Sequence, residues 1–469
     1  MSTLLRHPVA PVRHVSRPAT ETRRYFVLGV MVVALERFAI PTEGGSVALM
    51  PLVVVALLVW DLIMTRLRLA ADRVLIYLSF VIVGCIATGL STGQNLLSLA
   101  QVALLVLPAS LCLGQAFWPQ AGWGQSANLG NAGRSFLLGI VSVTVCASGV
   151  AVVQSAFSAA GVGYFDPVGL LPSRFLVEGF NTAYPVVWGG GWLKANGGFF
   201  LEPSVLSLYC GLSLVALLAF WDGYTRRRAW VCTILLLAGM ATSVAVSGLI
   251  VLPILIWQVG RRRFGVGRVA VVSLVLLALI GSVPVVRQFA EKAAVDPTLA
   301  STSAGLRLYA PYAELLPHAW AHPVVGAGSG YARQIVESQL VVSTTPTLVK
   351  LLIDFGVLGA ALFAALVLAL CVAARLPGVI KVALVVALVV PTDALAPGPI
   401  AISVLLALAL SDPGAQRSAR RGAGPPLPRS VGAGGYDPGR SVLREEKKWL
   451  GRGCRRCGGP PRTGRVIRL

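Results

Sequence analysis

The sequence predicts an all-α polytopic membrane protein with about twelve transmembrane helices and two long extracytoplasmic loops. Its 469 residues are 56% hydrophobic and only 13% charged. Soluble domains average about 25% charged residues, so this composition excludes an ordinary soluble enzyme. Apolar runs long enough to cross a bilayer recur along the chain, and arginine-rich segments separate alternate pairs of runs.

Twelve apolar runs are candidate membrane spans, because about 20 helical residues cross the hydrocarbon core of a bilayer. Three of them, the eighth and the last two, are short for a span. The candidates cover residues 25–41, 46–65, 74–91, 96–116, 134–158, 203–221, 229–244, 246–260, 268–286, 346–373, 379–392 and 398–411.

The basic residues predict the orientation of these spans, because cytoplasmic loops of membrane proteins carry the excess of Lys and Arg. Such residues cluster in the connections 66–73, 226–228, 261–263 and 375–381. A cytoplasmic amino terminus places all four connections, and the carboxyl terminus, in the cytoplasm. The two long loops, residues 159–202 and 287–345, then face outward. Loops of this length usually carry function.

Two basic cytoplasmic tails, residues 1–24 and 412–469, are expected to flank a membrane domain at 25–411. Residues 413–469 carry 14 Lys and Arg but 3 Asp and Glu, and they are rich in Gly and Pro, so we expect this tail to be disordered. Most of the net charge of +21 lies in the tails. Basic tails beside a bilayer are typical of contacts with anionic membrane lipids. The charge therefore does not indicate nucleic acid as a partner.

The eight cysteines predict neither a disulfide framework nor a metal site. Six lie in apolar runs, where Cys behaves as a small hydrophobic residue. Cys454 and Cys457 form a single CxxC, and a structural zinc site needs two further ligands. Arg23 and Arg24 precede a first apolar run without a small-residue cleavage site, so no cleavable signal peptide is expected.

One stretch, residues 194–209, leads from a polar loop directly into an apolar helix. Asn196-Gly197-Gly198 is typical of a turn with unusual backbone angles. Glu202-Pro203-Ser204 predicts a helix start, with proline in the first turn and an acid at the positive helix end. Glu202 is interpreted either as a helix cap at the membrane surface or as a functional acid, since a charge at this depth is costly without a partner or a role.

Both long loops carry candidate ligand-binding residues. Arg174 and Arg307, one in each loop, oppose the positive-inside bias, and a guanidinium matches the geometry of phosphate oxygens. They are interpreted as a joint clamp on an anionic lipid-linked substrate or as ordinary solvated charges. The aromatic residues, Tyr309 among them, fit either stacking on sugar rings or an interfacial belt. His318 and His322 have the chemistry of general bases, although His322 precedes Pro323 and a glycine-rich turn that favours a structural role.

Four features follow one another along the membrane domain. They are the basic residue and Asn-Gly-Gly-Phe-Phe-Leu-Glu-Pro-Ser at 194–204, Thr242-Ser243 before the basic residues at 261–263, Arg307 followed by His322-Pro-Val-Val-Gly-Ala-Gly, and the stretch from Lys350 to Gly359. In this order they resemble the O-antigen ligase and O-antigen polymerase (Wzy-like) superfamily of bacterial polysaccharide membrane proteins. The similarity covers most of residues 25–411.

This resemblance implies a GT-C-like membrane glycosyltransferase of the bacterial inner membrane that uses no metal and no cofactor. Its expected partners are undecaprenyl-pyrophosphate-linked glycans, membrane lipids and other polysaccharide-assembly proteins. The resemblance assigns pyrophosphate binding to arginines at an outer-leaflet site. It implies substrate contacts for Arg174, Lys194, Arg307, Tyr309 and His322. Arg174 and Gly190 also match the polymerase pattern of an arginine and a glycine separated by fifteen residues.

One departure from the family pattern concerns the start of the 346–373 span. Ligases of this family usually carry a histidine there, whereas this chain has Thr344-Thr345-Pro346-Thr347. The departure favours a polymerase of lipid-linked repeat units over a ligase. Glu202 then becomes the candidate catalytic base, because a carboxylate can accept the proton of an acceptor hydroxyl.

Three alternatives remain open at the level of the sequence. A ligase would transfer a finished glycan to an acceptor. A polysaccharide transporter or flippase is a different class, but such proteins usually carry charges near the bilayer midplane or paired interrupted helices, and the runs here are nearly free of charge. The third alternative is a structural membrane protein without catalysis, which the two long loops disfavour.

Overall fold

The computed structural model describes residues 19–42, 45–90, 96–114, 131–177, 184–185, 193–221, 224–251, 253–255, 257, 310–338, 345–390 and 399–412. All of these residues belong to one unit, Met1–Gly414. The predicted tails at 1–24 and 412–469 lie almost entirely outside the described residues, as do the 268–286 span and residues 287–309 and 339–344 of the second long loop.

The described part is predominantly helical. Its α-helices are α1 (Ala19–Ala34), α2 (Leu49–Ile63), α3 (Ala71–Leu90), α4 (Leu96–Val106), α5 (Asn131–Ala159), α6 (Pro203–Ala219), α7 (Arg226–Ser243), α12 (Tyr331–Ser338), α13 (Thr347–Ala373), α14 (Gly378–Val389) and α15 (Pro399–Ala409). Short 3-10 or π turns are η1 (Leu107–Ser110), η4 (Ser173–Phe175), η6 (Val246–Val251), η8 (Pro311–Leu315) and η9 (Leu316–Ala321). Among the described helices, Ala71–Leu90, Ala132–Ala159 and Thr347–Ala373 are long and apolar enough to cross a membrane.

The mostly helical structure is compatible with the predicted all-α membrane protein, and its helices are accompanied by three short antiparallel ladders. They pair β1 (Ala39–Thr42) with β2 (Gly45–Ala48), β3 (Leu67–Leu69) with β4 (Leu111–Leu113), and β5 (Tyr184–Pro185) with β6 (Leu193–Lys194). Two predicted spans are shortened as a result. The 25–41 run leaves the helix after Ala34, and the 96–116 run ends as a helix before Pro108, whose ring cannot continue the hydrogen-bond ladder.

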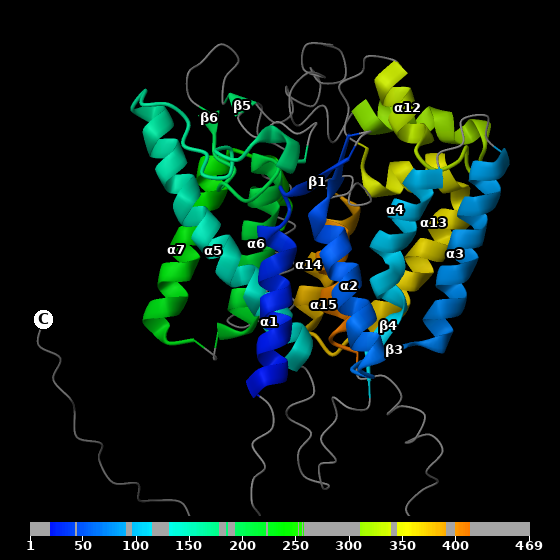
Figure 1. The fold of residues 1–469 in the computed structure, drawn as a ribbon, viewed down its shortest axis with the longest axis horizontal. Coiled ribbons are helices and arrows are strands. Elements are labelled where there is room, and N and C mark those ends of the chain that lie inside the picture. Colours follow the sequence, from blue (N-terminus) through cyan, green and yellow to red (C-terminus); the bar gives the residue numbers. More distant parts are fainter. Residues whose placement is uncertain are drawn as a thin grey trace, which may run out of the picture. The chain divides into compact units, whose positions relative to one another are not determined.

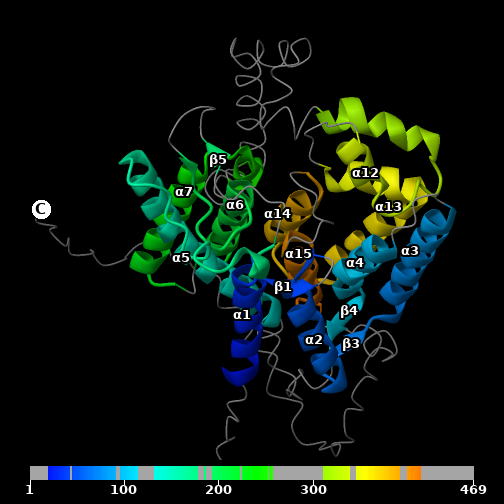
Figure 2. The same cartoon turned by 45° about the horizontal axis from the view of Figure 1, so that its top comes forward.

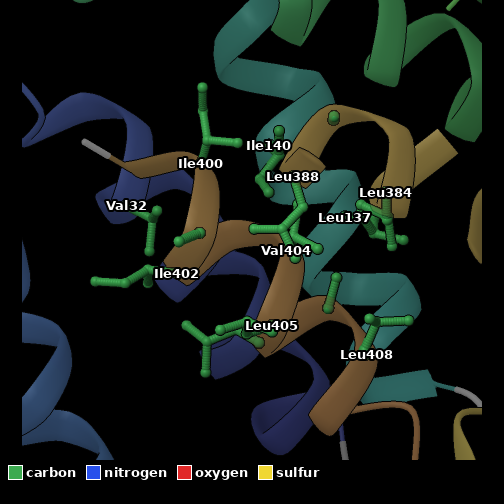
Figure 3. Packing of buried hydrophobic residues seen from close by; sticks show 14 of the residues in the cluster. Val32, Leu137, Ile140, Leu384, Leu388, Ile400, Ile402, Val404, Leu405 and Leu408 are labelled. Carbon is green, nitrogen blue, oxygen red and sulfur yellow. The ribbon is translucent and has the colours of Figure 1, made fainter. Parts of the chain in front are cut away.

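The helices form a bundle around α15. Helices α1, α5, α6 and α7 pack together on one side, and α3 packs along α13 on the other, while α14 and α15 contact both groups (Figure 1). Almost every residue of α15 is buried, which suits a helix that is apolar on all faces. Figure 3 shows Ile400, Val404 and Leu408 of α15 among side chains of α1, α5 and α14.

Successive helices run in opposite directions, so the bundle has two ends (Figures 1 and 2). We call the loop end the one where α1, α3, α5 and α7 finish. There an isolated bridge joins Phe38 to Leu176, and Ser329 N donates to Thr88 Oγ1 over 3.1 Å. Segments of both long loops therefore lie at the same end of the described helices.

Basic residues gather at the opposite end. Asp61, at the end of α2, accepts from Arg24 over 2.8 Å and from Arg66 over 3.4 Å. Arg73, at the start of α3, pairs with Asp412 beyond α15. Charges that the sequence assigns to one face of the membrane are thus brought together from four separate segments.

Candidate functional site

The turn at Asn196 organises a buried polar network at the loop end. Asn196 is fully buried, and its Oδ1 accepts from Gln154 Nε2 (3.1 Å), Tyr164 OH (2.9 Å) and the backbone N of Gly198 (3.0 Å). Gly197 and Gly198 have φ of 70° and 77°, the left-handed region that other residues avoid. The sequence-based prediction of a turn with unusual angles is confirmed. The turn is locked onto α5 through Gln154, whose Oε1 accepts from Gly197 N over 2.8 Å.

An ion pair closes this network against the end of α1. Arg37 donates to both carboxylate oxygens of Asp166, over 2.7 and 2.8 Å, and also to the carbonyl of Gly198 over 2.6 Å. Burial alone would raise the pKa of Asp166, but the hydrogen bonds and the charge of Arg37 lower it overall. Burial raises the pKa of the nearby Tyr164 phenol to about 12, so this hydroxyl stays protonated as a donor.

Glu202 stands at the cap position of α6, as predicted, with Pro203 as the first helical residue. Its backbone is extended, and its side chain makes no capping bond to the first-turn amides. Instead Glu202 Oε2 accepts from Ser204 Oγ over 2.9 Å, and the side chain is partly exposed. A partly exposed carboxylate beside a hydroxyl has the chemistry that a general base needs.

A second acid lies beside Glu202. Glu36 follows the end of α1 and is buried, with 2% of its surface exposed. Its Oε1 accepts from the backbone N of Leu201 over 3.3 Å, one residue before Glu202. The negative charge of Glu202 acts on this carboxyl, so the two acids lie within electrostatic range. With Asp166, the loop end thus holds three carboxyl groups, and the contact of Glu36 with Leu201 joins segments 165 residues apart.

Two predicted cationic residues lie around this network rather than inside it. Lys194 belongs to β6, opposite Tyr184, and is half-buried. Arg174 lies in η4, where it is exposed and its guanidinium stands 5.0 Å from the centre of the Phe175 ring. The segment bearing Arg174 packs against β1 at the loop end. Arg307 and Tyr309 lie outside the described residues.

His322 begins a loop that is inserted into an interruption of α13. Gly356 takes φ 65° and ψ −171° within this helix, and the break frees backbone groups on either side. The loop satisfies these groups with four hydrogen bonds: Ala327 N to Ile353 O (2.8 Å), Gly328 N to Asp354 O (3.0 Å), Val357 N to Pro323 O (2.8 Å) and Leu358 N to Val324 O (3.1 Å). This insertion explains why the chain carries a glycine-rich turn after His322 and a glycine after Phe355.

Asp354 holds the other end of the inserted loop. Its carboxylate is fully buried and accepts from the backbone N of Gly330 (3.0 Å) and of Ala332 (2.8 Å), at the start of α12. A negative charge is stabilised at the positive end of a helix. The charge in this span therefore has a structural partner within the fold.

One cavity lies between the end of α3 and the inserted loop, and a second lies beside α13. His322 is exposed and lines a cavity of about 370 Å³ together with Ser329, Tyr331 and Gln334, and the described part of this lining carries no Asp, Glu, Lys or Arg. A second cavity of about 460 Å³ opens between α13 and α14 and is almost wholly apolar. Two hydrogen bonds tie the helices beside it, from Thr347 Oγ1 to Leu388 O and from Lys381 Nζ to Cys371 O, both of 2.7 Å.

The structure brings Glu202 together with residues that the sequence reading did not assign to the site: Glu36, Arg37, Gln154 and Asp166. A charged Glu-Arg pair at the end of one apolar run and a lone glutamine inside another are the signals that point to Glu36, Arg37 and Gln154. Among the described residues, no group of three His, Cys, Asp or Glu side chains lies close enough to hold a metal ion. No known protein family, no curated protein and no solved structure matches this chain.

Proposed function

We propose that the chain is an outer-leaflet glycosyltransferase that polymerises undecaprenyl-pyrophosphate-linked oligosaccharide repeat units in exopolysaccharide or O-antigen synthesis. The observation that carries the proposal is the setting of Glu202. This acid occupies the cap position of an apolar helix, lies at the end of the bundle that bears segments of both long loops, and belongs to the stretch that resembles the polymerase superfamily.

In the proposed reaction, an acceptor hydroxyl oxygen attacks the anomeric carbon of the lipid-linked sugar. The bond from that carbon to the pyrophosphate oxygen breaks, and its electron pair leaves with undecaprenyl pyrophosphate. The hydroxyl proton passes to Glu202. Cationic side chains from both loops, Arg174, Lys194 and Arg307, hold the leaving pyrophosphate. Arg37 is excluded from this task, because both terminal nitrogens of its guanidinium already donate to the carboxylate of Asp166.

The two cavities support a substrate with one polar and one apolar end. Among the described residues, the cavity at His322 carries the polar side chains of Ser329, Tyr331 and Gln334 beside apolar ones, and such polar groups suit the hydroxyls of a sugar. The cavity between α13 and α14 is apolar, which suits part of a polyprenyl chain. We assign the neutral glycan to the first and the hydrocarbon tail to the second.

The proposal is tested by deleting the gene and restoring it with variants. Glycans extracted from the deletion strain should carry single repeat units, because a polymerase defect leaves attachment intact. Accumulation of full-length lipid-linked chains without any attached glycan would instead identify a ligase, and an unchanged glycan profile would contradict the proposal.

Glu202→Gln is the decisive variant. Gln keeps the size and the acceptor for Ser204 but cannot take a proton, so polymer should be lost while the protein still accumulates. Glu337→Gln is the matched control, because Glu337 is an exposed partner of Arg333 on α12. Normal polymer from Glu202→Gln would return Glu202 to a structural role.

A further inference from the structure

Glu36 is a buried carboxyl group with an oxygen that nothing satisfies. Its side chain lies just beyond the end of α1, and only 2% of the residue is exposed. Oε1 accepts from Leu201 N, whereas Oε2 has no hydrogen-bond partner among the described residues. A buried charged oxygen without a partner is costly, and proteins usually avoid that cost by neutralising the group.

Among the described residues, Arg37 offsets a charge on Glu36 only in part. Arg37 is adjacent in the chain, but Asp166 and the carbonyl of Gly198 occupy its donors. On α6, the nearby Tyr209 hydroxyl pairs with Ser403 over 2.7 Å, and Glu202 adds a second negative charge.

The direction of titration follows from these contacts. Burial raises the pKa of Glu36 well above its usual value, and the charge of Glu202 raises it further. The Leu201 amide and the charge of Arg37 act in the opposite direction but do not offset burial.

We propose that Glu36 and Glu202 together hold one proton at neutral pH, with the proton on Glu36 and the charge on Glu202. Glu36 is then a positioning residue, which supplies an uncharged partner beside the base and touches no substrate. The role given to Glu202 rests on the proposed function, whereas the shared proton does not. Pairs of acids whose environments separate their protonation states are a recurring arrangement in acid–base sites.

The pair of acids also determines how Glu202 loses its proton after each reaction. When Glu202 takes the acceptor proton, both carboxyl groups become neutral. One proton must then return to water, and it leaves from Glu202 because that side chain is partly exposed while Glu36 is sealed. Glu36 keeps its proton throughout the cycle.

Infrared spectroscopy of the purified full-length protein tests the shared proton without any substrate. A protonated carboxyl group gives a carbonyl-stretch band that a carboxylate lacks. We expect this band at neutral pH, and we expect Glu36→Gln to remove it. Asp72→Asn is the control, because Asp72 is exposed at the start of α3 and its change should leave the band in place. Absence of the band, or its persistence in Glu36→Gln, would overturn the proposal.

A second variant decides the question if Glu36→Gln fails to accumulate. Glu202→Gln removes the charge that favours the protonated form of Glu36. The band should therefore persist at neutral pH in Glu202→Gln but disappear at a lower pH on alkaline titration than in the unmodified protein. An unshifted titration would contradict the pairing of the two acids.

Activity measurements separate this proposal from the proposed function. Because Gln resembles a protonated Glu, Glu36→Gln should keep most of the polymerase activity at neutral pH and lose less of it at alkaline pH than the unmodified protein. Complete loss of activity in a folded Glu36→Gln protein would overturn the positioning role. If the protein shows the carbonyl-stretch band of protonated Glu36 but forms no glycosidic bond, the proposed function is wrong. The proposal of a proton on Glu36 then still holds.

Discussion

Arg37 and Asp166, 129 residues apart in the chain, meet in a two-contact ion pair with distances of 2.7 and 2.8 Å. The pair joins the end of α1 to the loop that follows α5, and Arg37 reaches on to the turn before α6 through the carbonyl of Gly198. One side chain thus fixes three segments around the Glu202 network.

The first prediction concerns this ion pair. Asp166→Ala leaves the guanidinium of Arg37 buried without its partner, and breaking a buried pair typically costs about 3–5 kcal/mol. We expect the lower part of that range, because 16% of the Asp166 side chain is exposed. The free energy of unfolding should fall in Asp166→Ala and in Arg37→Ala, and the double variant should lose less than the two losses combined.

The control for this double-mutant cycle is the exposed ion pair of Arg333 and Glu337 on α12, whose side chains are 78% and 61% exposed. Removing either of them should change stability by less than about 1 kcal/mol. Strict additivity of the Arg37 and Asp166 effects would show that the pair does not act as a unit.

The second prediction concerns the interruption of α13. Gly356→Ala places a Cβ against the carbonyl of Val324 and forces a left-handed backbone on alanine, which costs about 1–2 kcal/mol before any clash. We expect a loss of about 2 kcal/mol or more, measured as a lower melting temperature and lower protein level. Gly149→Ala in α5 is the matched control, since nothing lies within 4 Å of its added Cβ. Equal stability of the two variants would contradict the inserted-loop arrangement.

The helix starts and turns were predictable where the signal is local. Pro203 and the acid before it predicted the first turn of α6, and Gly197 with Gly198 predicted the positive φ angles. The interruption at Gly356 was not predictable, because the apolar run from 346 to 373 is continuous in sequence. The break is stabilised by a loop that lies more than twenty residues earlier in the chain, and such pairing has no local signature.

The candidate site was predictable only in part for the same reason. Glu202 was identified from its own surroundings, but Glu36 meets Leu201 across 165 residues. A charged pair at the end of an apolar run marks Glu36 and Arg37 as unusual without naming their partners. The structure also gives Asp354 a partner in the start of α12, which the sequence could not assign.

The third prediction concerns orientation. Ser173 lies in η4 at the loop end and is exposed, and Ala71 is exposed at the opposite end. In a cysteine-free background, Ser173→Cys should react with a membrane-impermeant thiol reagent in intact cells. Ala71→Cys should react only after the cells are opened. The reverse pattern would invert the proposed topology, with the loop end in the cytoplasm.

The last prediction concerns Arg174 and Arg307. Arg174 is exposed at the loop end, its guanidinium stacks on Phe175, and among the described residues no carboxylate forms a salt bridge with it. A guanidinium held in this way is preorganised for an anion. If Arg174 and Arg307 bind one pyrophosphate, replacing either with Ala should lower polymer yield by at least about tenfold. The double variant should be little worse, because the effects of groups that act together on one substrate are not additive.

Lysine should rescue each position incompletely, since a point charge cannot supply two parallel hydrogen bonds to phosphate oxygens. Arg333→Ala is the matched control, because Arg333 is an exposed arginine at the same end of the bundle that pairs with Glu337 on its own helix. All variants are compared at equal protein level by the length distribution of extracted glycan. Full activity of Arg307→Ala would contradict the joint binding of pyrophosphate by the two arginines. Losses that multiply in the double variant would show that the two arginines act on separate parts of the substrate.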